Sequence, residues 1–150
     1  MGIHCYKHDY GLIYNSENNY FQDFLAAQEV VFEYTGTYAT AVRFPGGSRT
    51  AFMLGCKYKG GFPEFMELMH GMGVRCYDWS IQPEIAKSSY DVTYSFTHPA
   101  AAYDGDICLQ HDTRPYSVHA LEDMIRWALE EGYTFLPVDV TTPEILFEMK

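Results

Sequence analysis

The sequence predicts an α/β fold built from strand–helix–strand units. Short apolar segments alternate with longer amphipathic segments at spacings of roughly 25 to 35 residues, as in chains that fold into a parallel sheet or barrel. The 150 residues are 47% hydrophobic and 17% aromatic, which excludes disorder and suffices for a sizeable core. Four or five units fit this length, whereas a complete eight-unit barrel needs about 250 residues. We therefore expect one domain over residues 1–150.

The clearest helix is predicted over residues 17–35. Ser16 can cap its N-terminus, Gly36 can end it, and apolar residues recur between them at helical spacing. A second amphipathic helix is predicted over 117–131, with Ser117 as its cap. Shorter helices are expected over 63–70 and 143–149.

Strands are expected over five short apolar segments between these helices. The stretch 49–60 is ambiguous, and 83–102 is weakly patterned and expected to be partly loop. The predicted strands cover residues 2–5, 41–44, 74–81, 107–110 and 134–138.

Charge and composition exclude several classes of function. Ten basic and twenty acidic residues give a net charge of -10, which disfavours nucleic acids and anionic membranes as partners. No apolar run is long enough to predict membrane insertion, and the first twenty residues lack a signal-peptide pattern. Four cysteines without C-x-x-C pairing are expected to be buried free thiols: Cys5, Cys56, Cys76 and Cys108.

Polar residues that could carry chemistry lie at the ends of the predicted strands, where parallel barrels gather their reactive groups. The first strand ends at a histidine pair with H-x-x-x-H spacing, which can bring two imidazoles to one divalent metal. Taken singly, the histidine pair fits two surface histidines equally well, the Arg43 segment is more often a turn than a site, and His111-Asp112 could be a loop pair. Their order along the chain and their place at strand ends favour a site. The segments are His4 and His8, Arg43-Phe44-Pro45-Gly46-Gly47, Asp78-Trp79-Ser80, and Leu109-Gln110-His111-Asp112.

Together these motifs resemble the polysaccharide deacetylase domain, the NodB-homology domain of carbohydrate esterase family 4. Its H-[ST]-x-x-H motif is matched by residues 4–8, its R-x-P-[YG] motif by residues 43–46, and its L-x-H-D-like motif by residues 109–112. The resemblance covers nearly all of the chain and is weakest over residues 83–103. It implies an incomplete, distorted (β/α) barrel of about five strands with helices outside.

The resemblance also implies metal-assisted hydrolysis of N-acetyl groups on N-acetylglucosamine-containing glycans of the peptidoglycan or chitin type. His4 and His8 would bind the divalent metal, zinc or another transition metal such as cobalt. His111 would act as general acid and Arg43 would hold the general base. Four further residues would form the substrate and oxyanion site: Pro45, Gly46, Trp79 and Leu109.

The sequence departs from the family pattern at two motifs. The T-F-D-D-G-P motif, which carries the catalytic base and the third metal ligand, is absent from these 150 residues. In the fourth motif, W-x-V-D-x-x-D-W, Gln82 and Ile85 stand where aspartates are expected, and Glu84 or Asp78 are the candidates to replace the second of them.

These departures leave alternatives to an active deacetylase of the cell wall. One is a catalytically degenerate protein that binds carbohydrate through a groove lined by residues such as Tyr6, Tyr10 and Trp79. The other is a truncated fragment that needs a partner or a homo-oligomer to cover its open sheet edge. The family resemblance favours an extracellular or cell-envelope location, and the lack of a signal peptide favours a cytoplasmic one.

Overall fold

The computed structural model describes residues 1–55, 61–84, 87–98 and 105–148. The chain divides into two compact units, one formed by Met1–Asp78 and Val138–Lys150, the other by Trp79–Pro137. The fold is α/β, as predicted. No helix in the described part of the chain is long and apolar enough to cross a membrane.

The first unit contains a parallel sheet with the strand order β1-β2-β3. The strands are β1 (Gly2–Ile3), β2 (Ala41–Val42) and β3 (Arg75–Cys76), each at a predicted position but shorter than predicted. Ile3 is in register with Val42, and Val42 with Cys76, and all three side chains are buried. Parallel neighbours need crossover connections, which the intervening helices provide.

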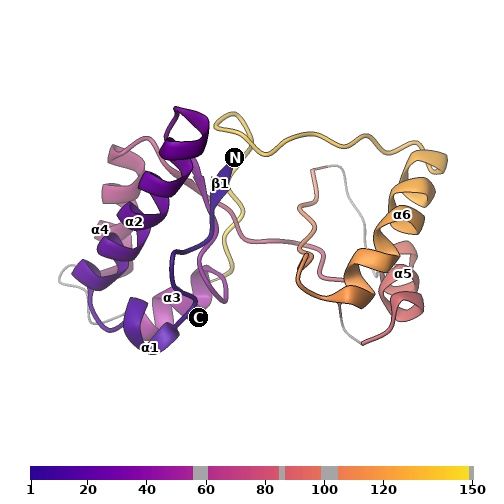
Figure 1. The fold of residues 1–150 in the computed structure, drawn as a ribbon, viewed down its shortest axis with the longest axis horizontal. Helices are drawn as coiled ribbons and strands as arrows, with labels where there is room; N and C mark the ends of the chain where they lie inside the picture. The colour runs from indigo at the N-terminus through magenta and orange to yellow at the C-terminus, as the bar shows by residue number, and fades with distance from the viewer. Residues whose placement is uncertain (56–60, 85–86, 99–104, 149–150) are drawn as a thin grey trace. The chain divides into compact units, whose positions relative to one another are not determined.

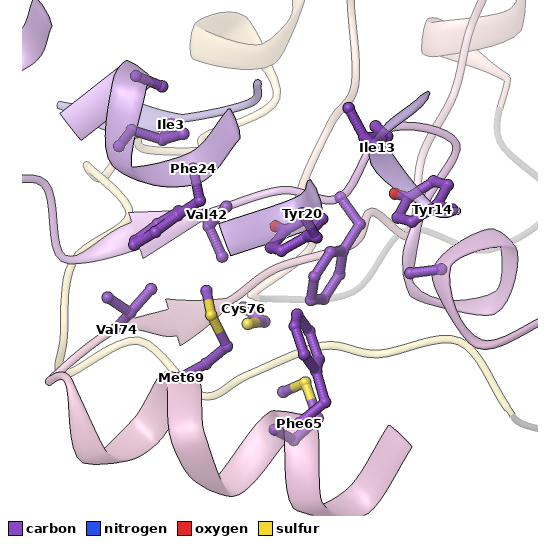
Figure 2. Packing of buried hydrophobic residues seen from close by; sticks show 14 of the residues in the cluster. Ile3, Ile13, Tyr14, Tyr20, Phe24, Val42, Phe65, Met69, Val74 and Cys76 are labelled. Atoms are coloured by element: carbon purple, nitrogen blue, oxygen red, sulfur yellow. The ribbon is translucent and has the colours of Figure 1, made fainter. Parts of the chain in front are cut away.

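The helices of this unit are α1 (Tyr10–Ile13), α2 (Glu17–Thr35), α3 (Ser48–Gly55) and α4 (Gly61–Gly71). Helices α2 and α4 contact each other through Tyr20 and Phe65, whose ring centroids are 5.1 Å apart. Figure 2 shows Phe24 of α2 and Met69 of α4 packing with Val42 of β2 in the same buried cluster. The sheet and these two helices therefore enclose the main core.

Local signals explain why α2 has the predicted bounds. The Ser16 side chain accepts a hydrogen bond from the Asn19 N–H at 3.1 Å, which caps the first turn. Gly36 ends the helix with a φ of 70°, a left-handed conformation that glycine adopts at little cost.

The second unit is built on α5 (Ser89–Thr97) and α6 (Pro115–Glu130), which pack side by side in Figure 1. Val92 of α5 and Ala120 and Met124 of α6 form its buried cluster. A parallel bridge joins Ile81 to Cys108, so the segments flanking these residues run alongside each other.

Several sequence predictions are corrected by the structure. About five strands were expected, whereas the described residues form three strands and the Ile81–Cys108 bridge. The predicted strand over 134–138 is irregular. The described residues of the predicted helix over 143–149 are not helical. Their backbone forms hydrogen bonds with residues far away in sequence instead: the Asp78 N–H donates to the Ile145 carbonyl at 2.6 Å.

Helix α6 begins two residues before the predicted cap. Arg114 is the N-cap and Pro115 takes the first helical position, where its fixed φ and missing N–H are favourable. The Ser117 hydroxyl is buried and accepts a hydrogen bond from Gln110 Nε2 at 3.1 Å. The short helix α1 and helices α3 and α5 were not predicted.

Three of the four cysteines lie in the described residues, and all three are free thiols. Cys76 is buried as predicted, Cys5 is half-buried, and Cys108 is exposed, contrary to prediction; Cys56 lies outside the described residues. Burial, and next the Asp23 carboxylate, raise the pKa of Cys5 to about 11, so this thiol is neutral at physiological pH.

Candidate active site

The histidine pair begins directly after β1. Nδ1 of His4 lies 2.8 Å from the Arg43 carbonyl oxygen. Because a carbonyl only accepts, Nδ1 is the donor in this hydrogen bond, which fixes the orientation of the His4 ring. The His4 and His8 ring centroids are 5.1 Å apart, tilted by 49°, and both residues are exposed. Two exposed imidazoles therefore lie next to each other directly after β1.

A third ligand does not join this pair within the described part of the chain. There, no group of three or more His, Cys, Asp and Glu side chains is placed to hold a metal ion. Within the described residues, a metal at this place would find two imidazoles, one of them oriented by a backbone carbonyl, and no third side-chain ligand.

Arg43 follows β2 and joins the ends of all three strands. Its N–H donates to the Ile3 carbonyl at 2.9 Å, and its guanidinium donates to the carbonyls of Tyr77 at 3.2 Å and Asp78 at 3.4 Å. Arg43 thus bridges the carboxyl end of β3 to the backbone that orients His4.

Pro45 and Gly46 form the centre of a tight turn. The Gly47 N–H donates to the Phe44 carbonyl at 2.8 Å, and Gly46 has a φ of 76°, as the third position of a type II turn requires. The Gly46 N–H donates to no other described residue. Gly46 also lines an open groove with five other residues: Arg49, Thr50, Met53, Phe147 and Glu148.

The Asp78 carboxylate is fully buried just after β3. It accepts hydrogen bonds from the Ser48 N–H at 2.8 Å, from the Ser48 hydroxyl, and from the Phe147 N–H at 2.7 Å. Asp78 therefore fastens the C-terminal segment to the first turn of α3.

In the second unit, the carboxylate bonded to His111 belongs to Glu84. One Glu84 oxygen accepts from the His111 N–H at 2.8 Å, and the other contacts His111 Nδ1. Arg114 Nη1 donates to that second oxygen at 2.9 Å. The Glu84 side chain is fully buried, whereas that of His111 is 37% exposed. His111 therefore turns Nδ1 toward a carboxylate and keeps Nε2 for other partners.

The hydrogen bonds to Glu84 decide its charge. Burial alone would raise the pKa of Glu84, but hydrogen bonds from Ser117 and from the N–H and imidazole of His111 outweigh burial, and the pKa lies below its ordinary value. The ionised Glu84 carboxylate is therefore the hydrogen-bond partner that orients the His111 ring.

Trp79 and Leu109 lie on the two segments that the Ile81–Cys108 bridge joins. Trp79 is half-buried, and its indole N–H donates to the Gln82 side chain at 3.1 Å. Leu109 is half-buried, and its N–H donates to the Ile81 carbonyl at 2.8 Å. The structure thus gathers the eight predicted site residues in two groups: His4, His8, Arg43, Pro45 and Gly46 in the first unit, and Trp79, Leu109 and His111 in the second.

The sequence matches no protein-family model and no curated protein. The structure does match solved ones. The catalytic domain of peptidoglycan N-acetylglucosamine deacetylase from Eubacterium rectale is 26% identical, with a TM-score of 0.85 over 99% of this chain and 69% of that one. The chain has the polysaccharide deacetylase fold.

Two further deacetylase structures agree with this assignment. The polysaccharide deacetylase Bc1974 from Bacillus cereus is 18% identical, with a TM-score of 0.79 over 97% of this chain and 69% of that one. A family 4 carbohydrate esterase from Streptomyces lividans, solved in complex with acetate, is 13% identical, with a TM-score of 0.67 over 94% of this chain and 66% of that one. The predicted family resemblance is confirmed.

The sequence left open whether Glu84 or Asp78 replaces the second aspartate of the fourth deacetylase motif. The pattern places an aspartate at position 85, but Ile85 lies outside the described residues, and the residue before it carries the carboxylate. The signal in the sequence was a glutamate one position before the expected aspartate; its burial, and with it the need for a partner, comes from the structure.

Proposed function

We propose that this protein is a metal-dependent hydrolase that removes N-acetyl groups from N-acetylglucosamine-containing glycans of the cell wall. The observation that carries the proposal is the exposed His4–His8 pair, whose ring centroids lie 5.1 Å apart and in which Nδ1 of His4 is bonded to the Arg43 carbonyl. The deacetylase fold supports the reaction class. We also propose that the three parallel strands belong to the wall of a distorted barrel, and that the protein works outside the cell or in the envelope.

His4 and His8 would hold a divalent ion, with zinc the first choice and cobalt the second. When bound, such an ion supplies Lewis-acid polarisation of the N-acetyl carbonyl and lowers the pKa of water. The Gly46 N–H would donate to the oxyanion that develops on that carbonyl oxygen. Arg43 would stabilise the negative charge of a catalytic base.

His111 would protonate the departing amine of the sugar. Nδ1 of His111 is engaged in a hydrogen bond to Glu84, so the proton delivered to the amine nitrogen would come from Nε2. Glu84 would hold the His111 ring in the orientation that this transfer needs, as the buried carboxylate of a catalytic triad does. Trp79 and Leu109 would line the pocket that receives the sugar and its acetyl methyl group.

The first test measures acetate release from N-acetylglucosamine oligomers with the purified protein, zinc and cobalt. We expect turnover with metal when a segment that carries the T-F-D-D-G-P aspartates is supplied, loss of that turnover in His4→Ala and His8→Ala, and a kcat about 10²–10⁴-fold lower in His111→Ala. His119→Ala is the matched control, because His119 is an exposed histidine of α6. Equal rates in His111→Ala and the unsubstituted protein would remove His111 from the mechanism.

A second candidate is a glycan-binding protein without turnover. It is favoured by the lack of a three-residue metal group among the described residues. Calorimetric binding of N-acetylglucosamine oligomers without acetate release would support it, and its partner would be the glycan alone. Assembly into a homo-oligomer belongs to the other alternative, a truncated fragment whose open sheet edge needs cover, and sedimentation tests it.

A further inference from the structure

The loop between the two histidines is held by one carboxylate of α2. Asp23 Oδ2 accepts a hydrogen bond from the Tyr6 N–H at 2.8 Å, and Oδ1 accepts one from the Lys7 N–H at 2.7 Å. These two amides lie between His4 and His8 in the sequence. Both bonds are short and have an ionised acceptor, which makes them stronger than bonds between neutral groups.

Helix α2 fixes the position of this carboxylate. Asp23 shares a helical stripe with Tyr20, three residues before it, and with Ala27, four residues after it. Both neighbours are buried in the main core, and Asp23 itself is half-buried. The carboxylate is therefore anchored to a rigid element, whereas the residues it binds belong to an exposed loop.

The chain is also held on both sides of the two amides that bind Asp23. On the N-terminal side, Nδ1 of His4 is held by the Arg43 carbonyl. On the C-terminal side, the Asp9 carboxylate caps α1 by accepting from the Leu12 N–H at 3.1 Å. Tyr6 and Lys7 lie between these two anchors, so without Asp23 nothing else in the described residues holds their amides.

We propose that Asp23 is a positioning residue for the metal site, because it presets the separation and tilt of the two imidazoles before metal binds. This inference rests on the proposed metal site at His4 and His8. A preset pair binds metal more tightly, since the ordering of the loop has already occurred in the folded protein. Supporting residues of this kind typically change metal affinity by about 10–100-fold.

The test compares Asp23→Ala, Asp23→Asn and Glu29→Ala by calorimetric titration with zinc and with cobalt alone. Glu29 is an exposed residue of the same helix, so Glu29→Ala removes the same charge without touching the loop. We expect about 10–100-fold weaker binding in Asp23→Ala, a smaller loss in Asp23→Asn, which keeps one acceptor oxygen, and no loss in Glu29→Ala.

Amide hydrogen exchange of the metal-free protein supplies a second readout. The Tyr6 and Lys7 amides should exchange faster in Asp23→Ala, while the amides of α2 keep their protection. Two outcomes would overturn the role of Asp23 but not the metal site: unchanged metal affinity in Asp23→Ala, or Tyr6 and Lys7 amides that are unprotected in the unsubstituted protein. Failure of the unsubstituted protein to bind either metal would overturn the proposed metal site, and the role of Asp23 with it.

Discussion

Glu84 links the stability of the second unit to pH. Its pKa in the folded protein is lower than in the unfolded chain, so it stabilises the fold above its unfolded pKa of about 4.5, and this stabilisation is lost as the pH falls through the folded value. We predict that Glu84→Gln lowers the free energy of unfolding by about 1–3 kcal/mol at pH 7 and by much less at pH 3. Urea unfolding at both pH values measures this, with Glu130→Gln on the exposed face of α6 as the control. Equal losses at the two pH values would contradict it.

Position 46 requires glycine for two reasons: its backbone φ is positive, and a larger side chain would be too close to its neighbours. A Cβ at this position would lie 2.9 Å from the Tyr10 hydroxyl and 2.9 Å from Thr50 Oγ1, and the φ of 76° is unfavourable for alanine. We predict that Gly46→Ala costs about 1–3 kcal/mol of stability. Adding Tyr10→Phe should recover part of this loss by removing the hydroxyl, and strictly additive effects in the double-mutant cycle would show that the two residues do not compete for space.

At the scale of elements, the C-terminal segment is held by a buried carboxylate. Asp78→Ala would leave the N–H and the hydroxyl of Ser48 without their acceptor, and it would remove one of the two acceptors of the Phe147 N–H. Because each unsatisfied buried donor costs about 1–3 kcal/mol, we predict a loss of roughly 2–5 kcal/mol and fast exchange of the Phe147 amide. Asp78→Asn, which keeps one acceptor oxygen, should lose less. A protected Phe147 amide in Asp78→Ala would show that the segment is held by other contacts.

The elements that the sequence predicted well depend on local signals. The bounds of α2 follow from Ser16 and Gly36, which act on the residues beside them. The C-terminal segment was wrongly predicted to be helical, because its hydrogen bonds go to Asp78 and Ser48, far away in sequence. Helix α5 was missed because its sequence is rich in serine, threonine and tyrosine, which are weak helix formers, and its packing on α6 decides the outcome.

At the scale of the whole molecule, parallel topology explains which site residues could be predicted. The rule that reactive groups follow strand ends placed His4 after β1 and Arg43 after β2, and the Arg43 bonds to Ile3 and Tyr77 confirm that these ends meet. Asp23 and Glu84 could not be found in this way. Asp23 lies within a helix, and Glu84 reaches His111 because the Ile81–Cys108 bridge aligns their two segments.

Metal binding at the histidine pair should stabilise the fold, because the folded state brings together two imidazoles that are four residues apart in a flexible unfolded chain. A metal at one hundred times its Kd adds about 2.7 kcal/mol to the free energy of unfolding if it binds the folded state alone. We predict a gain of this size with cobalt, reversed by a chelator, in the unsubstituted protein and in His119→Ala. His4→Ala and His8→Ala should lose most of it. Thermal unfolding of the four proteins with and without cobalt measures the gain, and an equal gain in all four would place the metal elsewhere.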